Sequence, residues 1–335
     1  MDTTLKDVAR EAGVNLSTAS RSLNDAYGVH PKTREHVLAV ARRLNYRPNR
    51  VARGLVTGRS QTMALIVSDI RNPFFAEVAR GAEDAAYEAD CDLVLCNSDL
   101  DNAKQMQYIE SLLSKRVDGI LMNSVTALNR VQQEQLAGSD VPVVLLNRSS
   151  TFRTFSTVSG DNAEGGALAA KHLISLGHKR IAHFTGPRHH GNLTERTKGF
   201  LKVLQSSRVP EPVVIHGKHT FLGGYEIAKK ALAENRMITA VFSANDVMAF
   251  GCIRAAIELG IRIPDDLSVI GFDNVEVSQI ISPPLTTIDQ PKYEMGKAAM
   301  EMLLKMAVHK DQEPEHRVIG VRLVERQSCR KIHTS

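Results

Sequence analysis

The sequence predicts an all-α N-terminal unit followed by an α/β body of two doubly wound lobes. Its 335 residues are too many for one ordinary hydrophobic core, so several domains are expected. Up to Ser60 the chain shows short helical periodicities separated by tight turns, whereas after Ser60 short apolar runs alternate with helix-sized segments. These two patterns predict two structural classes within one chain.

The composition is that of an ordinary globular protein, with 43% hydrophobic and 24% charged residues. No run approaches the roughly 18 apolar residues that a membrane span needs, and the N-terminus lacks the apolar stretch of a signal peptide. We therefore expect a cytoplasmic protein. The four cysteines have no CxxC spacing, so we expect reduced, structural thiols, no metal site and no cofactor. They are Cys91, Cys96, Cys252 and Cys329.

The charge is distributed unevenly along the chain. Residues 1–59 contain eleven Lys and Arg against five Asp and Glu, a balance of +6. The other 276 residues carry 31 basic against 32 acidic side chains, a balance of −1. A basic headpiece on a nearly neutral body is typical of binding to a phosphate backbone, although a solvated charged face alone would give the same count.

The first helix is predicted from about Leu5 to Ala12. Thr4 followed by Asp7 forms a capping-box pattern, in which each side chain binds an otherwise unpaired backbone N–H of the first turn. Gly13 follows directly and can adopt the left-handed conformation that ends a helix. The sequence therefore sets both ends of this helix locally.

Two further helices are predicted in the same unit. Asn15 is a good N-cap for a helix from about Leu16 to Asn24, and Pro31 suits the first position of a third helix. The third helix repeats apolar residues at core spacing, at Val37, Val40, Ala41 and Leu44.

The second helix has the features of a recognition helix. Ala19 and Leu23 are its inward pair, and a tight turn containing Gly13 precedes it, as in the helix-turn-helix motif that reads the DNA major groove. Arg21 can bind a guanine edge through two hydrogen bonds, or it can contact phosphate alone. The side chains predicted to face outward are Leu16, Ser17, Ser20 and Arg21.

In the body, short β-rich runs spaced by amphipathic segments predict βαβ units with parallel sheets. Helices are expected between the runs, for example from Phe75 to Ala89 and from Glu164 to Leu176. Ligands of such sheets bind beyond the carboxyl ends of the strands, so the cleft between the lobes is the expected site. The runs are Ala64–Val67, Leu93–Cys96, Gly119–Met122, Val143–Leu146, Ile181–Phe184, Ala240–Phe242 and Ser268–Phe272.

The segments "TLKDVAREAGVNLSTASRSLN" and "KTREHVLAVARRLNYRPNRVARGL" resemble the headpiece of the lactose repressor and galactose repressor family. The resemblance implies a helix-turn-helix headpiece over residues 1–47 and a hinge helix or linker over residues 48–60. Leu55 would then wedge into the minor groove and kink the duplex. The implied DNA-binding residues are Thr4, Leu16, Ser17, Thr18, Arg21, Asn24, Lys32, Thr33, Asn49, Arg50, Ala52 and Leu55.

The rest of the chain, through landmarks such as "SDIRNPFFAEVARGAE" and "IPDDLSVIGFDN", is similar to the body of the same family, which resembles periplasmic sugar-binding proteins. Residues 61–335 would form the effector-binding and dimerisation body. The resemblance implies an N-terminal lobe of residues 61–160 and 291–318 and a C-terminal lobe of residues 161–288 and 319–335.

The same resemblance implies an effector pocket in which amide, carboxylate and guanidinium groups bind hydroxyls and phenylalanine covers an apolar ring face. Two assignments have alternatives, because Asn245 can simply cap the following helix and Phe75 can belong to the core. The implied effector-binding residues are Phe74, Phe75, Asn147, Asn192, Arg196, Phe221, Asn245, Asp273 and Gln290.

Together these features predict a homodimeric, ligand-responsive transcription regulator that binds a pseudo-palindromic operator and is associated with the nucleoid when bound to DNA. Repression of carbohydrate-utilisation genes, with a sugar or sugar derivative as effector, is the expected role. A sugar-binding receptor without gene regulation is the alternative. An enzyme is not expected, because no GxGxxG after a strand, P-loop, HExxH or GxSxG motif occurs.

Overall fold

The computed structural model describes residues 3–46, 58–123, 128, 130–147, 154–187, 191–309 and 312–332. The chain separates into two compact units, Met1–Ser60 and Gln61–Ser335. The predicted hinge contacts Asn49, Arg50, Ala52 and Leu55 lie outside the described residues. Within the described part of the chain, no helix is both long and apolar enough to cross a membrane.

The headpiece contains the helices α1 (Leu5–Glu11), α2 (Leu16–Leu23) and α3 (Pro31–Arg43), which confirms the three predicted helices. The capping box is present, with 3.0 Å between the Thr4 amide and the Asp7 carboxylate. Asn15 Oδ1 accepts from the Thr18 amide at 2.7 Å, and Gly13 has a φ of 66°. The core of the headpiece consists of Val8, Ala9, Ala12, Ala19, Val37, Val40 and Ala41.

The first sheet of the body has the strand order β11-β5-β4-β3-β1-β2, with parallel pairing throughout. Helices α5 and α13 cover one face of this sheet and α6 and α7 the other, as the two core clusters show. The strands are β1 (Thr62–Val67), β2 (Asp92–Asn97), β3 (Gly119–Met122), β4 (Val143–Leu146), β5 (Ser156–Gly160) and β11 (His316–Ile319). The helices are α5 (Phe74–Glu88), α6 (Asn102–Ser114), α7 (Arg130–Ala137) and α13 (Lys292–Val308).

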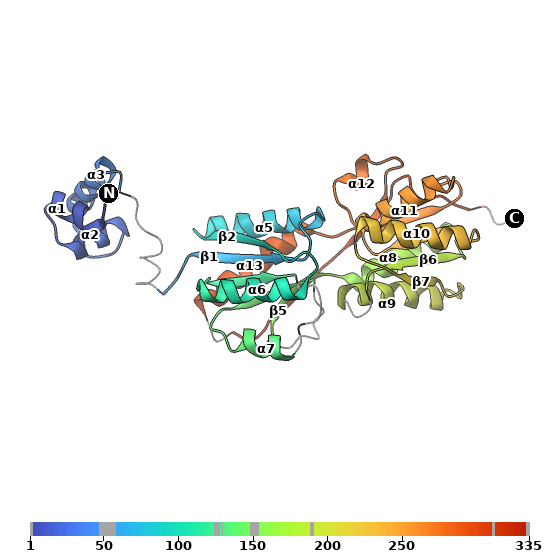
Figure 1. Ribbon diagram of the computed structural model, residues 1–335, viewed down its shortest axis with the longest axis horizontal. Helices are drawn as coiled ribbons and strands as arrows, with labels where there is room; N and C mark the ends of the chain where they lie inside the picture. The colour runs from blue at the N-terminus through green and yellow to red at the C-terminus, as the bar shows by residue number, and fades with distance from the viewer. Residues whose placement is uncertain are drawn as a thin grey trace. The chain divides into compact units, whose positions relative to one another are not determined.

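The second sheet has the order β12-β10-β9-β8-β6-β7, and only the β10–β12 pair is antiparallel. Helices α8 and α9 cover one face, and α10 and α11 the other (Figure 1). The strands are β6 (Ile181–Thr185), β7 (Val213–His216), β8 (Ala240–Ser243), β9 (Ser268–Asp273), β10 (Thr286–Asp289) and β12 (Arg322–Val324). The helices are α8 (Asn162–Ser175), α9 (Gly191–Ser206), α10 (Phe221–Glu234), α11 (Asp246–Glu258) and α12 (Val277–Ile280).

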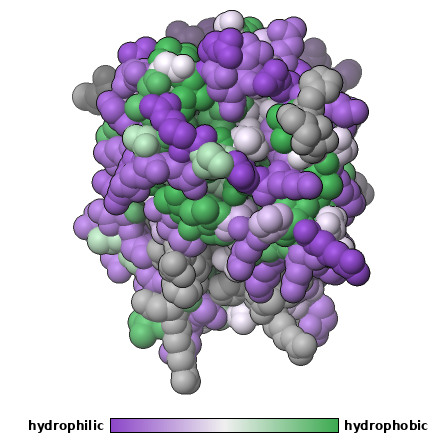
Figure 2. Space-filling view, turned by 90° about the vertical axis from the view of Figure 1, so that its right-hand side faces the viewer, coloured by the Kyte–Doolittle hydropathy of each residue, from purple (hydrophilic) through white to green (hydrophobic). Residues whose placement is uncertain are grey.

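Burial follows from this layered arrangement. Every residue of β1 after Thr62, and every residue of β3, β4 and β8, is buried, as expected for parallel strands covered on both faces. At the outer end of the C-terminal lobe, hydrophilic residues cover most of the surface, with smaller hydrophobic areas between them (Figure 2). Each apolar run that predicted a strand lies within a strand of the structure, which confirms these predictions.

The chain passes between the two lobes at three described crossovers: between β5 and α8, between β10 and α13, and between β11 and β12. The elements after the second crossover return to the N-terminal sheet, and β12 completes the C-terminal one. Both lobes are therefore built from segments that are distant in sequence, and the crossovers lie at the carboxyl ends of β5, β10 and β11.

Candidate functional site

Helix α2 presents an exposed polar face in the headpiece. Leu16 is 45% exposed, Ser17 and Arg21 are also exposed, and Arg21 forms no ion pair with any described residue. Ser17 Oγ donates to Asn15 Oδ1 at 2.7 Å, which orients the hydroxyl at the start of the helix. The outward set is therefore confirmed for Leu16, Ser17 and Arg21, whereas Ser20 is half-buried.

Inward packing of α2 differs in one detail from the prediction. Ala19 is fully buried, but its buried companion is Ser22, whose hydroxyl donates to the Thr18 carbonyl at 2.8 Å. Leu23 is only partly buried against the same cluster. A serine can take an inward position because the carbonyl four residues earlier satisfies its donor.

The start of α3 adds further polar groups. His30 is the N-cap, and its Nδ1 accepts from the Lys32 amide at 3.3 Å, while the Lys32 side chain is exposed and Thr33 is half-buried. Of the remaining predicted contacts, Thr4 and Asn24 are exposed and Thr18 is half-buried. The headpiece therefore carries two exposed clusters of potential donors, on α2 and at the N-terminus of α3.

Arg34 has a different role from its neighbour Lys32. Its guanidinium donates to the Asp25 carboxylate and to the carbonyl of Ala26, so it holds the connection between α2 and α3. The side chain is 27% exposed. Since both of its terminal nitrogens are bound within this loop, Arg34 acts first on the conformation of the loop.

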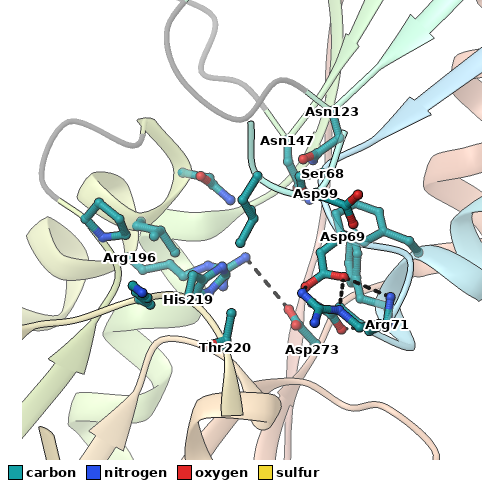
Figure 3. Close-up of a pocket in the computed structure, with 18 residues that line it drawn as sticks. Ser68, Asp69, Arg71, Asp99, Asn123, Asn147, Arg196, His219, Thr220 and Asp273 are labelled. Atoms are coloured by element: carbon teal, nitrogen blue, oxygen red, sulfur yellow. Dashed lines mark hydrogen bonds and ion pairs between the residues drawn. The ribbon is translucent and has the colours of Figure 1, made fainter. Parts of the chain in front are cut away.

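The body contains a cavity of about 510 Å³ between its two lobes. Ser68, Asp69, Arg71, Asp99, Asn123 and Asn147 come from the N-terminal lobe, and Arg196, His219, Thr220 and Asp273 face them from the C-terminal lobe (Figure 3). Most of these residues follow the carboxyl ends of strands, as expected for doubly wound sheets. The other lining residues are Asn72, Phe74, Phe75, Leu100, Pro187, Asn192, Leu193 and Lys218.

Arg196 is the central cation of the C-terminal wall. Its Nε donates to Asn162 Oδ1 at 2.8 Å, its Nη1 donates to the Ala244 carbonyl, and its guanidinium carbon lies 3.7 Å from the Phe272 ring centroid. Its Nη2 lies 3.8 Å from Asp273 Oδ1. Complete burial lowers the pKa of Arg196 to about 10, although Asp273 opposes this shift.

Close packing of two helices sets the position of Arg196. A Cβ at Gly166 would lie 2.0 Å from the Arg196 carbonyl oxygen, and a Cβ at Gly199 would lie 1.9 Å from the Ala163 carbonyl oxygen. Helices α8 and α9 therefore approach more closely than any side chain would allow at these two positions. This approach brings Asn162 on α8 within hydrogen-bond distance of Arg196 on α9.

Asp273, at the end of β9, is the acidic partner of Arg196. It is 3% exposed and has a φ of 115°, a left-handed backbone conformation that is strained for a residue with a Cβ. Burial raises the pKa of Asp273 to about 7, an effect that Arg196 opposes and that Asp246 reinforces. Gln290 Nε2 donates to Asp273 Oδ1 at 2.7 Å. A carboxyl held in this way can accept from, or donate to, a ligand hydroxyl.

The N-terminal wall combines an ion pair, an aromatic pair and a free amide oxygen. Arg71 binds Asp69 through two hydrogen bonds of 2.8 and 2.9 Å, and Phe74 and Phe75 pack edge to face with centroids 5.2 Å apart. Asn147 is 5% exposed, has a φ of 52°, and its Oδ1 has no partner among the described residues. A buried acceptor without a partner is costly unless a ligand or water donates to it.

Six of the nine residues predicted for the pocket line the cavity: Phe74, Phe75, Asn147, Asn192, Arg196 and Asp273. The other three lie nearby in different roles. Phe221 begins α10 and is 45% exposed, Asn245 is fully buried and caps α11 by accepting from the Met248 amide, and Gln290 supports Asp273. In the described part of the chain, no group of His, Cys, Asp and Glu side chains is arranged to hold a metal ion.

The prediction missed polar residues that directly follow strands. Ser68, Asp69 and Arg71 follow β1, Asp99 follows β2, and Asn123 follows β3. Their position immediately after an apolar run was the available signal. Lys218, His219 and Thr220, between β7 and α10, gave a weaker signal because β7 is short and largely exposed.

Comparison with known proteins supports both units. Residues 4–49 match the family model of bacterial regulatory proteins of the lacI family, and residues 170–329 match the periplasmic binding protein-like domain. Catabolite control protein A of Priestia megaterium is 38% identical over 308 residues, which cover 91% of this chain and 92% of that protein. The transcriptional repressor PurR of Photorhabdus laumondii is 38% identical over 333 residues, covering 97% and 96%.

Solved structures of similar fold include the lac repressor dimer bound to operator and the anti-inducer ONPF. That chain is 29% identical, with a TM-score of 0.88 over 98% of this chain and all of the other. A regulator from Enterococcus faecium with bound ribose is 32% identical, with a TM-score of 0.74, and covers 81% of this chain and 100% of its own. Both matched families and these relatives are regulators or binding domains, not enzymes.

Proposed function

Because the chain belongs to the LacI family of bacterial regulatory proteins and is a DNA-binding transcription regulator, we propose that it represses carbohydrate-utilisation genes in response to a sugar. The effector binds in the cavity between the two lobes and changes the affinity of the headpiece for its operator. As a regulator of bacterial genes, the protein acts in the cytoplasm.

The arrangement of Arg196 and Asp273 carries the effector proposal. A cation and a carboxyl 3.8 Å apart, both buried, offer a donor and an acceptor to adjacent hydroxyls. Phe74 and Phe75 supply an apolar surface, and Asn147 Oδ1, which has no partner within the described part of the chain, adds an acceptor. Structures in the family with bound ribose and with cellobiose support a carbohydrate as ligand. Asn192, on α9, contributes a polar side chain to the lining. The effector site also includes three residues just behind this lining, which are Phe221, Asn245 and Gln290.

A screen of ligands tests the effector. We expect a member of a panel containing ribose, cellobiose, other sugars, sugar phosphates and purine bases to raise the melting temperature of the full-length protein, because a ligand that binds only the native state stabilises it by mass action. Asp273→Ala removes the carboxyl and should abolish the shift. A normal shift in this variant would remove Asp273 from the site, and a purine as the sole hit would contradict a sugar effector.

The exposed face of α2 carries the DNA-binding proposal. Leu16, Ser17 and Arg21 contact base edges in the major groove, while Lys32 and Thr33 contact phosphates. Thr4, Thr18 and Asn24 lie on the same unit and contribute to the backbone contacts. The resemblance adds Asn49, Arg50, Ala52 and Leu55 of the hinge, with Leu55 as the minor-groove wedge.

Selection of duplexes from a random pool tests this interface. The wild-type protein should enrich one pseudo-palindromic sequence. Arg21→Ala should bind that duplex about 1–3 kcal/mol more weakly and accept other bases at one position, whereas Lys32→Ala should weaken all duplexes equally and reduce the salt slope by about one unit. Enrichment of the same sequence by the Arg21 variant would reject base reading by Arg21.

A homodimer is the expected assembly, and edge strand β2 offers a surface for it. Val94 and Leu95 are neighbours on this strand, so their side chains point to opposite faces of the sheet, yet both are exposed, by 41% and 42%. Tyr87 on the adjacent helix α5 is 77% exposed. An edge strand with apolar side chains open on both faces favours burial against a second copy. The lac repressor dimer with the same fold supports this assembly. Sedimentation that shows a stable monomer on the selected duplex would contradict it.

A further inference from the structure

Lys292, the first residue of α13, lies directly after a crossover between the two lobes. Its ammonium group donates to the carbonyl oxygens of Asp273 at 2.7 Å, Asn274 at 3.0 Å and Gln290 at 3.1 Å. An ammonium group has three donors, so these contacts use all of them. The side chain is 11% exposed, which is rare for lysine and requires such compensation.

Two of the three carbonyl groups belong to residues with a left-handed backbone conformation. Asp273 and Asn274 have φ values of 115° and 54°, so consecutive residues adopt left-handed conformations. Gln290, on the crossover itself, binds the Asp273 carboxylate through its side chain at 2.7 Å. The main chain and the carboxylate of Asp273 are therefore both attached to the same crossover.

The loop that begins at Asp273 has contacts in both lobes, through the backbone in its own lobe and through a side chain in the other. The Val275 amide donates to Asp246 Oδ2 at 2.9 Å, and the Val275 side chain is 2% exposed. Val275 belongs to the same buried cluster as Phe75 and Met295 of the N-terminal lobe. A single residue, Asn274, thus separates a carboxylate in the cleft from a side chain packed into the core of the opposite lobe.

We propose that Lys292 is a positioning residue for effector recognition, which fixes the Asp273 carboxylate in the cleft and couples its position to the crossover between the lobes. The inference rests on the proposed role of Asp273 in binding the effector. An ordinary ion pair explains the contacts less well, because the nearest carboxylate oxygen, on Asp289, lies 3.5 Å from Nζ and is farther away than all three carbonyl oxygens.

Hydrogen exchange of the ligand-free, full-length protein tests the positioning directly. Lys292→Met keeps the aliphatic stem and removes the donors. Amides of residues 274–278 should then exchange at least about tenfold faster, since hydrogen bonds to a charged group are lost there, while β6 and β8 keep the wild-type rate. Lys297→Met, on the same helix, is the matched control, because among the described residues Lys297 forms only a partly exposed pair with Glu88, at 3.9 Å. Unchanged exchange in the loop, or equal acceleration throughout the body, would overturn the proposal.

A double-mutant comparison separates positioning from a general structural role. Asp273 faces the charged groups of Arg196, Asp246 and Lys292 together with the amide of Gln290. At about pH 8, where Asp273 is largely ionised, Lys292→Met should lower the melting temperature more in the wild-type background than in Asp273→Asn. At about pH 5, where the carboxyl is protonated, the two losses should be equal. Equal losses at both pH values would overturn the proposal.

Both measurements use the protein without ligand. Their failure therefore counts against Lys292 alone, whereas an empty ligand screen counts against the proposed effector cleft.

Discussion

The headpiece and the body use charged residues in opposite environments. In the headpiece, Arg43 and Glu11 pair at 2.6 Å with side chains 63% and 51% exposed. In the body, Arg196 and Asp273 lie farther apart, at 3.8 Å, but are only 2% and 4% exposed. Burial lowers the pKa of Arg196 to about 10 and raises that of Asp273 to about 7, and each partner opposes the shift of the other. Distance alone therefore does not rank ion pairs, because water screens the first pair and is excluded from the second.

The largest expected effect follows from removing the buried cation. Arg196→Met should reduce the free energy of unfolding of the body by about 3 kcal/mol near pH 8, because it leaves the Asp273 carboxylate buried without its partner. Urea unfolding followed by circular dichroism measures this loss.

The pH dependence of that loss has a definite sign. The pKa of Asp273 is higher in the folded than in the unfolded chain, so the stability that its protonation provides is complete below about pH 4 and is lost as the pH rises through about 7. Arg196 lowers the pKa of Asp273, so this pKa should be still higher in the Arg196→Met variant. The variant should therefore continue to lose stability up to a higher pH than the wild type does. The cost of Arg196→Met should therefore be smaller near pH 5 than near pH 8. Equal costs at both values would contradict a coupled buried pair.

A core substitution in the headpiece tests whether the two units are independent. Val37 is fully buried in a small cluster, and Val37→Ala should destabilise the headpiece by about 2 kcal/mol. A small domain has little stability to lose, so exchange in α1 to α3 should accelerate strongly. Exchange in the sheets of the body should not change. Faster exchange in both units would show that they unfold together.

Loss of the capping box is the next smaller effect. Thr4→Ala removes a cap whose hydroxyl and amide both bind Asp7, and it should cost about 1 kcal/mol of headpiece stability. Thr4→Ser keeps the hydroxyl and is the control. Exchange of the first amides of α1 reports the difference, and identical behaviour of the two variants would exclude a contribution from the cap.

The smallest effect is expected at the exposed pair. Arg43→Gln should change headpiece stability by about 0.5 kcal/mol or less, although the contact is shorter than that of Arg196 and Asp273. The same exchange experiment measures it. A loss equal to that of Arg196→Met would invalidate the comparison between screened and buried pairs.

The two regions also differ in how far the sequence could predict them. Headpiece helices were predicted closely because their limits are local: Thr4 with Asp7, Asn15 and Gly13 determine the backbone within a few residues. The inward position of Ser22 was missed, because its hydroxyl is satisfied by a carbonyl of its own helix, a contact that apolar periodicity does not reveal.

In the body, the apolar runs predicted the strands. The family resemblance correctly predicted six residues that line the cavity. The contacts of Arg196 with Asn162 and of Lys292 with Asp273 could not be predicted, because they join residues 34 and 19 positions apart across different elements. Asn245 illustrates the limit in the other direction. Its position before Asp246 fits a ligand contact, with a helix cap as the alternative, and the structure shows the cap.

The central claim is that the cleft in the body and the DNA-binding face of the headpiece are thermodynamically linked. Calorimetric titration of the sugar found by the ligand screen, with and without the selected duplex, tests this linkage most directly. We predict that the duplex changes the affinity for the sugar by about 5–150-fold, and that the sugar changes the affinity for the duplex by the same factor. Identical sugar affinities with and without the duplex would contradict the account.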